Sequence, residues 1–223
     1  YCSKVYSFGP GQVQKILDTL KAEQIKQLTF IGKVSKEMLF RNPKLDKRSI
    51  SLLKSMKRVN DDAIMLKIIE ELNKEGIEVL DQTIFIKNLF LPKGVIGSIQ
   101  PTEEQLIDID YGFSLAKEMG RLDIGQSVIV QDKMVLAVEA IEGTDKAIKR
   151  GCQLGSGRAV VVKVSKPSQD QRFDIPTVGL QTVKIMKKYG AKVLAIEANE
   201  TLIVDKEEMV KFADKNKIVI VAV

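Results

Sequence analysis

Histidine and tryptophan are absent from this chain of 223 residues, and aromatic residues make up only 5% of it. The lack of histidine excludes Ser–His–Asp triads, Cys–His dyads, histidine-ligated zinc and imidazole acid–base catalysis. Any catalytic chemistry must therefore rest on carboxylates, lysines, arginines, hydroxyls and backbone groups, with or without a hard cation that prefers oxygen ligands.

Cysteine is nearly absent as well, because the chain holds only Cys2 and Cys152. Two such residues form neither a disulfide framework nor a metal-binding motif, and this sparse use is typical of a reducing cytosol. No apolar run approaches the length of a membrane span, and no signal peptide opens the chain. The first residue is Tyr1 and not Met, which is consistent with a start inside a longer protein.

What is present indicates a folded protein with an uneven charge. Hydrophobic residues make up 44% of the chain, which is enough to bury a core and excludes a disordered or fibrous protein. Residues 1–100 carry 17 Lys/Arg and 11 Asp/Glu, whereas residues 101–223 carry 18 of each, so the net charge of +6 belongs to the first part.

Nine basic residues and two acidic ones lie between Lys33 and Arg58. The basic residues are Lys33, Lys36, Arg41, Lys44, Lys47, Arg48, Lys54, Lys57 and Arg58. This basic tract is either a face for anionic lipid headgroups, nucleotide phosphates or nucleic acid, or an ordinary solvated surface. The low aromatic content argues against single-stranded nucleic acid.

Apolar periodicity predicts alternating helices and strands along the whole chain. In the first part we expect helices over 11–24 and 61–74, strands over 27–34 and 77–80, and no regular pattern in the basic tract. In the second part we expect a helix from Thr102 to Met119, a hairpin of 127–130 with 134–140, strands over 158–164, 192–198 and 218–223, and helices over 179–189 and about 205–215, the last capped by Asp205 with Glu208.

The segment 91–101 holds two prolines and two glycines and marks a domain boundary. We therefore predict an α/β protein of two domains. Residues 1–100 form the first of these domains, and residues 101–223 form the second, a mixed α/β domain that carries the chemistry.

The richest polar stretch runs from Lys163 to Pro176, directly after a predicted strand, where α/β proteins place their chemistry. Lys163, Lys166 and Arg172 offer cations for phosphate. Asp170 and Asp174 are close enough in sequence to share a site as metal ligands or as a base and a ligand. The alternative is an exposed charged loop with internal salt bridges.

A second polar stretch, from Glu139 to Asp145, follows the hairpin. Gly143 and Thr144 can present N–H groups and a hydroxyl to an anion, or Thr144 or Asp145 can simply cap a helix. Glu139 interrupts an apolar strand and can face solvent by strand alternation.

Three runs of the second part, GRLDIGQSVIVQD, VLAVEAIEGTD and KPSQDQRFDIPTVG, resemble the UDP-2,3-diacylglucosamine pyrophosphatases of lipid A biosynthesis that are unrelated to metallophosphoesterases. FIGKV, the DDAIM helix and the EGIEVL strand extend the resemblance more loosely into residues 1–100. The family normally opens with a strand and a glycine-rich turn that this sequence lacks.

The resemblance implies a two-domain protein in which residues 1–100 form a Rossmann-like domain that lacks its first strand. It also implies an enzyme that hydrolyses UDP-2,3-diacylglucosamine to UMP and 2,3-diacylglucosamine 1-phosphate (lipid X) with a divalent metal, usually Mg²⁺. It implies an essential aspartate at Asp170 or Asp174, with no choice between them. Candidate metal ligands are Asp174, Asp170, Asp145 and Glu142, and candidate substrate-binding residues are Lys163, Lys166, Arg172, Thr144 and Gln131.

The partners that follow are the glycolipid nucleotide and the surface of a membrane. We expect a cytoplasmic protein held peripherally at the inner membrane of a Gram-negative bacterium, with no nucleic acid partner and with a homodimer left open. The alternatives are a non-catalytic nucleotide- or lipid-binding protein and, on charge alone, a nucleic-acid binder.

Overall fold

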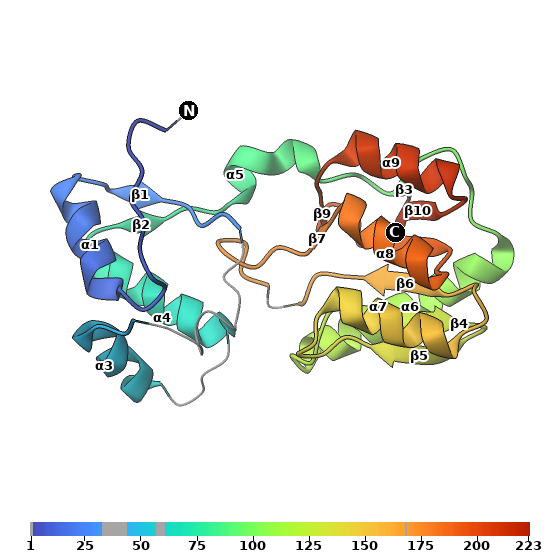
Figure 1. The fold of residues 1–223 in the computed structure, drawn as a ribbon, viewed down its shortest axis with the longest axis horizontal. Helices are drawn as coiled ribbons and strands as arrows, with labels where there is room; N and C mark the ends of the chain where they lie inside the picture. Colours follow the sequence, from blue (N-terminus) through green and yellow to red (C-terminus); the bar gives the residue numbers. More distant parts are fainter. Residues whose placement is uncertain (1, 33–43, 57–60, 168) are drawn as a thin grey trace. The chain divides into compact units, whose positions relative to one another are not determined.

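The computed structural model describes residues 2–32, 44–56, 61–167 and 169–223 (Figure 1). The chain forms two compact units, one made of Tyr1–Phe85 with Gln171–Asp174 and the other of Ile86–Asp170 with Ile175–Val223. We call them the N-terminal and C-terminal units. Both mix helices with strands, so the predicted α/β class is confirmed.

The N-terminal unit is small and is built around a parallel pair of strands. Its elements are α1 (Val13–Ala22), β1 (Gln27–Leu28), α3 (Lys47–Ser55), α4 (Asp61–Lys74), β2 (Glu78–Val79) and the start of α5 (Thr83–Ile86). β1 and β2 pair in parallel, and a parallel pair requires a crossover connection, which here contains α3 and α4. Its core is formed by Val13, Leu17, Ile69, Leu72, Ile77 and Val79.

Two predictions for this unit need correction. The strand expected over 27–34 is limited to β1, because Thr29–Gly32 are not paired, while residues 33 and 34 lie outside the described part of the chain. The basic tract, expected to be irregular, contains α3, whose N-terminus is capped by Asp46 through a hydrogen bond from the Ser49 N–H. The many charged residues obscured the apolar spacing of this helix, although its start has an ordinary capping residue.

The C-terminal unit holds a sheet of six strands in the order β3-β10-β8-β6-β4-β5. These strands are β3 (Gly94–Val95), β4 (Ser127–Gln131), β5 (Met134–Val138), β6 (Val160–Lys163), β8 (Val193–Ile196) and β10 (Val219–Ala222). β6, β8 and β10 run parallel to one another, whereas β4 is antiparallel to both β5 and β6. The predicted hairpin is therefore confirmed, with β5 at one edge of the sheet.

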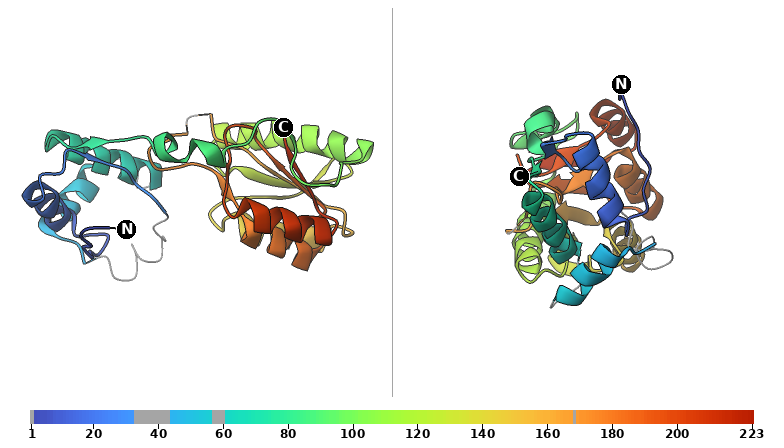
Figure 2. Two further views of the ribbon diagram at one scale, coloured as in Figure 1. Left: turned by 90° about the horizontal axis from the view of Figure 1, so that it is seen from above. Right: turned by 90° about the vertical axis from the view of Figure 1, so that its left-hand side faces the viewer.

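Helices cover both faces of this sheet, as the left view of Figure 2 shows. α6 (Glu103–Arg121) packs on one face through Ile109 and Ala116, against residues such as Val128 and Val162. α7 (Thr144–Leu154), α8 (Leu180–Tyr189) and α9 (Lys206–Lys215) cover the opposite face. Because successive residues of a strand point to opposite faces, both layers bury a continuous apolar surface.

The remaining elements are the turn η1 (Lys87–Leu89) and a two-stranded parallel pair of β7 (Thr177–Val178) with β9 (Leu202–Ile203). The capping box of Thr102 and Gln105 at the start of α6 is confirmed. The one predicted for Asp205 and Glu208 is wrong. Asp205 precedes α9 but has φ +52° and its side chain makes no capping bond, since capping side chains normally reach the helix from extended backbone.

Among the described residues, no helix combines the length and the apolar character that crossing a membrane requires.

Candidate functional site

Polar side chains gather at the edge of the six-stranded sheet where its parallel strands end. The register places Ser127, Lys163, Ile196 and Ala222 in one row across β4, β6, β8 and β10. Glu139 extends the row by one strand, because its N–H donates to the carbonyl of Ser127 at 2.8 Å. We call this the carboxyl edge; open α/β sheets bind their ligands at such an edge.

The first group at the carboxyl edge joins Lys163 to Glu139 through a threonine. The Lys163 Nζ donates to Thr144 Oγ1 at 3.2 Å and to the carbonyl oxygen of Thr177 at 3.0 Å. The Thr144 hydroxyl in turn donates to Glu139 Oε1 at 2.9 Å. Lys163 and Glu139 are each only 8% exposed. Two buried side chains of opposite charge therefore lie on either side of the Thr144 hydroxyl. Thr144 and Lys163, both predicted from the sequence, are thus brought together.

Glu139 lies where its strand ends against a glycine. Gly125 approaches its backbone so closely that a Cβ on Gly125 would lie 2.1 Å from the Glu139 carbonyl oxygen. The sequence left open whether Glu139 faces solvent; the structure buries it. The N-cap of α7 is Gly143, with φ +83° and no side chain to cap the helix, so neither Thr144 nor Asp145 has the capping position that was considered for them.

A second group at the carboxyl edge fixes the start of the loop after β6. Glu197, the residue after β8, accepts the Ser165 N–H at 2.7 Å and the Lys117 ammonium at 2.9 Å. The same ammonium donates to the Ser165 carbonyl oxygen at 2.9 Å. Gln169 then closes a turn, since its Oε1 accepts the Lys166 N–H at 2.7 Å.

The remaining residues of the predicted catalytic loop divide between the two units. Lys166 lies in the C-terminal unit and pairs with Asp123 at 2.8 Å. Asp170 belongs to the same unit, whereas Arg172 and Asp174 belong to the N-terminal unit.

The short segment 171–174 is held by the N-terminal unit itself. The Gln82 side chain donates to the Arg172 carbonyl oxygen at 3.2 Å, and the Gln82 N–H donates to the Gln171 carbonyl oxygen at 3.2 Å. Phe173 packs on the core of that unit. The segment is therefore attached to the N-terminal unit through its backbone and through Phe173.

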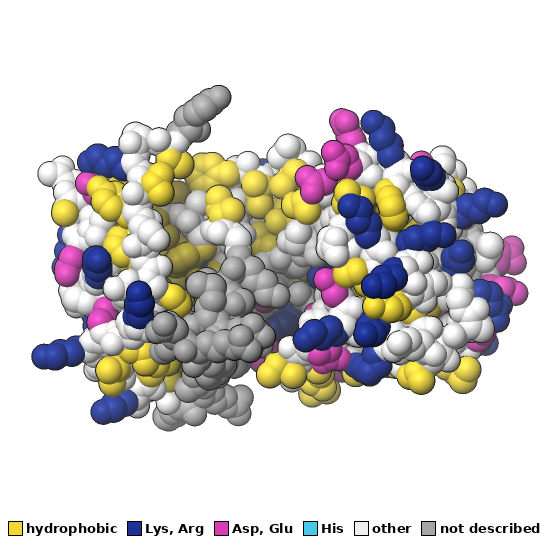
Figure 3. Space-filling model, in the orientation of Figure 1, with side chains coloured by type: hydrophobic (Ala, Val, Ile, Leu, Met, Phe, Trp, Pro, Cys, Tyr) yellow, Lys and Arg dark blue, Asp and Glu magenta, His cyan; other side chains and the backbone are white. Residues whose placement is uncertain are grey.

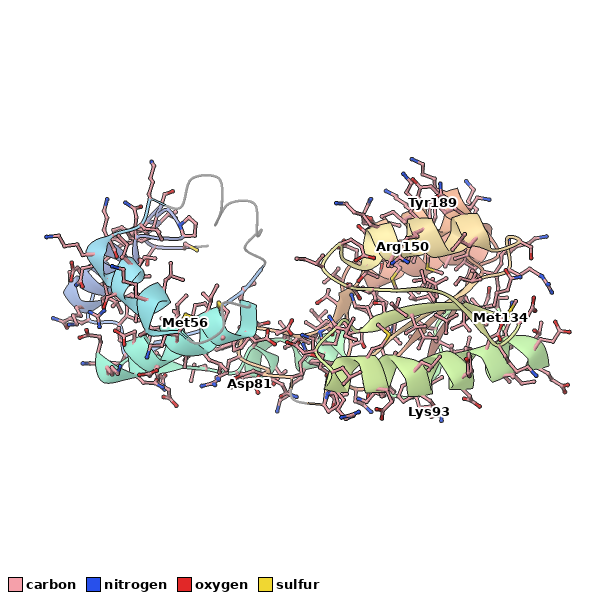
Figure 4. All side chains as sticks on the ribbon, turned by 90° about the horizontal axis from the view of Figure 1, so that it is seen from below. Met56, Asp81, Lys93, Met134, Arg150 and Tyr189 are labelled. Atoms are coloured by element: carbon pink, nitrogen blue, oxygen red, sulfur yellow. The ribbon has the colours of Figure 1, made fainter. Side chains whose placement is uncertain are left out.

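Three other predicted residues occupy different surroundings. Glu142 accepts an N–H of Arg150, on α7 (Figure 4), and this hydrogen bond lowers the pKa of Glu142. Asp145 is exposed in the first turn of α7. Gln131 lies at the far end of β4 from Ser127, where its amide donates to Ser156 Oγ at 2.7 Å. The structure does not bring Gln131 to the carboxyl edge.

Across residues 2–32, 44–56, 61–167 and 169–223, no three His, Cys, Asp or Glu side chains form a group that could hold a metal ion. Magnesium nevertheless needs only one or two carboxylates when water and phosphate complete its shell.

Unsatisfied polar atoms concentrate at the carboxyl edge. Within the described ranges, five buried side-chain atoms lack a hydrogen-bond partner: Thr29 Oγ1, Gln126 Oε1, Glu139 Oε2, Gln169 Nε2 and Thr201 Oγ1. All but the first belong to segments that enter or leave this edge. Buried polar groups in native proteins are nearly always paired, so such a concentration points to a ligand.

Sequence reasoning missed the burial of Glu139 and the part played by Glu197. A signal was available, because Val135–Glu139 reads VLAVE and Val193–Glu197 reads VLAIE. In both runs a glutamate directly follows four apolar residues of a buried or edge strand. An acid at that position lies at the end of its strand.

Comparison with known proteins adds the family. Residues 1–89 match the model of the LpxI N-terminal domain, and residues 92–221 match the model of the LpxI C-terminal domain. The chain is also 36% identical over 217 residues to the UDP-2,3-diacylglucosamine pyrophosphatase LpxI of Caulobacter vibrioides, an alignment that covers 92% of this chain and 77% of that protein. The resemblance predicted from the three sequence runs is confirmed, and this chain belongs to the LpxI family.

Proposed function

We propose that this protein hydrolyses the pyrophosphate bond of UDP-2,3-diacylglucosamine, giving UMP and 2,3-diacylglucosamine 1-phosphate in lipid A biosynthesis. The observation that carries the proposal is the 36% identity to a UDP-2,3-diacylglucosamine pyrophosphatase, which extends over 92% of the chain and so includes both domains. A non-catalytic binding protein is the less favoured alternative, because that relative is named as an enzyme.

The geometry of the carboxyl edge supports phosphate chemistry there. Lys163 is fixed by two hydrogen bonds from its ammonium group, so its charge is already positioned before substrate binds. A buried, preorganised cation stabilises charge that develops on phosphoryl oxygens more than a mobile one in water does. Lys166 lies three residues further on, and the turn closed by Gln169 holds its backbone.

In this mechanism a water molecule attacks a phosphorus atom of the pyrophosphate. Asp170 or Asp174 accepts the proton of that water, and Lys163 and Lys166 neutralise the charge on the transferred phosphoryl group. Arg172, in the N-terminal unit, stays a predicted phosphate-binding residue. Thr144, whose hydroxyl lies between Lys163 and Glu139, orients the lysine. The absence of histidine from the chain leaves carboxylates as the available bases.

The carboxylates of the predicted site suit magnesium as a cofactor. Asp170 or Asp174 would hold the ion, since Mg²⁺ is commonly bound by one or two carboxylates together with substrate phosphates. When bound, it would supply positive charge to the pyrophosphate oxygens. Glu142 is less suitable as a metal ligand than its sequence position indicated, because its carboxylate forms an ion pair with Arg150.

The proposal is tested by incubating the purified chain with UDP-2,3-diacylglucosamine and Mg²⁺ in oxygen-18 water. We expect release of UMP and of the lipid 1-phosphate, with the heavy oxygen in one of them, which identifies the phosphorus attacked. Binding of the substrate without release of UMP under Mg²⁺, Mn²⁺ or Co²⁺ would favour the non-catalytic alternative.

The proposed location is cytoplasmic, at the surface of the inner membrane, because the substrate carries two acyl chains. Although residues 101–223 are neutral as a whole, Figure 3 shows Lys and Arg side chains over the surface where α7 and α8 lie in Figure 1. The exposed basic residues of these two helices are Lys146, Lys149, Arg150, Lys184, Lys187 and Lys188. Such a face attracts anionic headgroups.

Sedimentation with vesicles tests this location. We expect the chain to bind vesicles rich in anionic lipid at low salt and the triple variant K184E/K187E/K188E to bind them much less, while both stay unbound to neutral vesicles. Of the basic tract expected to have this role, Arg48 is engaged by Glu71 and Glu75 within the N-terminal unit. Lys33, Lys36, Arg41, Lys57 and Arg58 lie outside the described residues.

A homodimer is part of the proposal as well. β5 is an edge strand of the sheet, and its residues Met134 and Val135 are 61% and 41% exposed. An exposed edge strand with apolar side chains can pair with a second copy. Light scattering after gel filtration should give twice the mass of 24.9 kDa.

A further inference from the structure

Only one of the two carboxylate oxygens of the buried Glu139 side chain has a hydrogen-bond donor among the described residues. Its Oε1 accepts the Thr144 hydroxyl at 2.9 Å, whereas its Oε2 is buried without a donor from any described residue. A carboxylate in that position is unfavourable for folding, because burial removes its hydration and only one of its oxygens is compensated. We therefore expect Glu139 to accept a hydrogen bond from a donor that is not part of the folded chain.

The surroundings of Glu139 select the chemistry of that donor. A phosphate or another anion is disfavoured beside a carboxylate. A cation is disfavoured because the Lys163 ammonium lies nearby, 3.2 Å from Thr144 Oγ1, and would repel it. The remaining possibility is a neutral donor, either a hydroxyl or an amide N–H group, with which a carboxylate oxygen forms a strong hydrogen bond.

The neighbouring residue supports a neutral donor. Gln126 Oε1 is a second buried acceptor without a partner among the described residues. Gln126 precedes Ser127, whose carbonyl oxygen accepts the Glu139 N–H at 2.8 Å, so both acceptors belong to adjoining strand ends. Gly125, which lies against the Glu139 backbone, leaves no room for a side chain there. The backbone is thus shaped to keep Glu139 at the carboxyl edge.

We propose that Glu139 is a ligand-binding residue and that its Oε2 accepts a hydrogen bond from a hydroxyl or N–H group of the bound sugar nucleotide. This inference rests on the proposed function. The substrate offers such donors in two places, the ribose and uracil of its UMP half and the sugar of its lipid half. Thr144 fixes the rotamer of the carboxylate, so Oε2 is the oxygen left to bind.

The test uses the full chain and the variant Glu139→Gln, which keeps the shape and the acceptor for Thr144 but can place an N–H group where Oε2 was. Glu207→Gln, an exposed glutamate in the first turn of α9, is the matched control. Equilibrium binding of UMP and, separately, of the lipid 1-phosphate is measured for all three proteins, together with kcat, KM and the thermal midpoint.

We expect Glu139→Gln to raise the Kd for one of the two products and the KM for substrate by about 10- to 100-fold, with kcat changed by less than about 3-fold. The product whose Kd rises identifies the half of the substrate that Glu139 contacts. The control should bind both products like the wild type.

Two results would overturn the inference while leaving the proposed function intact. In the first, Glu139→Gln binds both products normally while only its thermal midpoint moves, which is a purely structural role. In the second, kcat falls with KM unchanged and the acidic limb of the pH profile is lost, which makes Glu139 a base and not a binding residue. A wild-type chain that releases no UMP would contradict the proposed function instead.

Discussion

Lys117 and Glu197 together hold both backbone groups of a single residue, Ser165. The Glu197 carboxylate accepts the Ser165 N–H at 2.7 Å, and the Lys117 ammonium donates to the Ser165 carbonyl oxygen at 2.9 Å. The two side chains also pair with each other at 2.9 Å. Because Ser165 begins the loop that carries Lys166 and Asp170, this ion pair fixes the base of the predicted catalytic loop.

We expect Lys117→Met to lower kcat by about 10-fold or more while the KM for substrate changes little, because a displaced loop loses transition-state contacts first. Steady-state hydrolysis of UDP-2,3-diacylglucosamine measures both constants. Glu118→Gln, which breaks an exposed ion pair with Arg121 on the same helix, is the control and should keep wild-type rates. A normal kcat in a folded Lys117→Met protein would show that the ion pair of Lys117 and Glu197 does not position the loop.

The essential aspartate should be identified by Asp170→Asn and Asp174→Asn. We expect at least one of them to lose several orders of magnitude in turnover while its circular dichroism spectrum stays that of the wild type, because loss of a base or metal ligand removes a transition-state interaction. Near-wild-type rates in both variants would contradict the assignment.

Removal of divalent metal should also stop the reaction. EDTA should abolish wild-type activity and added Mg²⁺ should restore it.

Gly125→Ala should destabilise the carboxyl edge. A Cβ at this position would lie 2.1 Å from the Glu139 carbonyl oxygen, so the backbone of one of the two segments must move. We expect a loss of about 2–4 kcal/mol in the free energy of unfolding, measured by urea denaturation followed by circular dichroism. Unchanged stability would mean that residues 122–126 can shift freely away from Glu139.

The N-terminal unit should lose stability in acid through Glu71. Hydrogen bonds from Lys74 and from Arg48 lower the pKa of the Glu71 carboxyl below its ordinary value of 4.5. A carboxyl whose pKa is lowered in the folded state stabilises the protein above its unfolded pKa, and this contribution disappears as the pH falls through the folded pKa.

Arg48→Met should therefore cost about 2–3 kcal/mol near neutral pH, since Arg48 is a partly buried partner of Glu71 and of Glu75, and less in acid, where the carboxyls are protonated. Hydrogen exchange of α4 amides against pH measures the change, and α7 amides in the C-terminal unit serve as the internal control. An equal cost at all pH values would rule out the ion pairs as its cause.

The two cysteines should differ sharply in reactivity. Cys2 is exposed, whereas Cys152 is buried on α7, and burial raises the pKa of its thiol to about 11. Because the thiolate is the reactive form, we expect one fast-reacting thiol per chain with Ellman's reagent at about pH 8, and the second only after denaturation. Cys2→Ser should abolish the fast phase. Two equally fast thiols would contradict the burial of Cys152.

The sequence was most informative where local signals act alone. The boundaries of α4 and α8 and the capping box at Thr102 were predicted closely, because apolar spacing, a glycine stop and a capping pair are properties of neighbouring residues. The segment over α3 was missed, since its apolar residues are diluted by charge.

The absence of histidine restricted the expected chemistry to carboxylates and cations, and three runs of residues identified the family. Tertiary structure alone decided which of those charges meet. Lys163 ends β6, Glu139 follows β5 and Glu197 follows β8, and only the register of the sheet brings these strand ends to one edge. The burial of Glu139 was decided in the same way, because strand alternation is equally compatible with solvent and the close approach of Gly125 is a contact between distant segments.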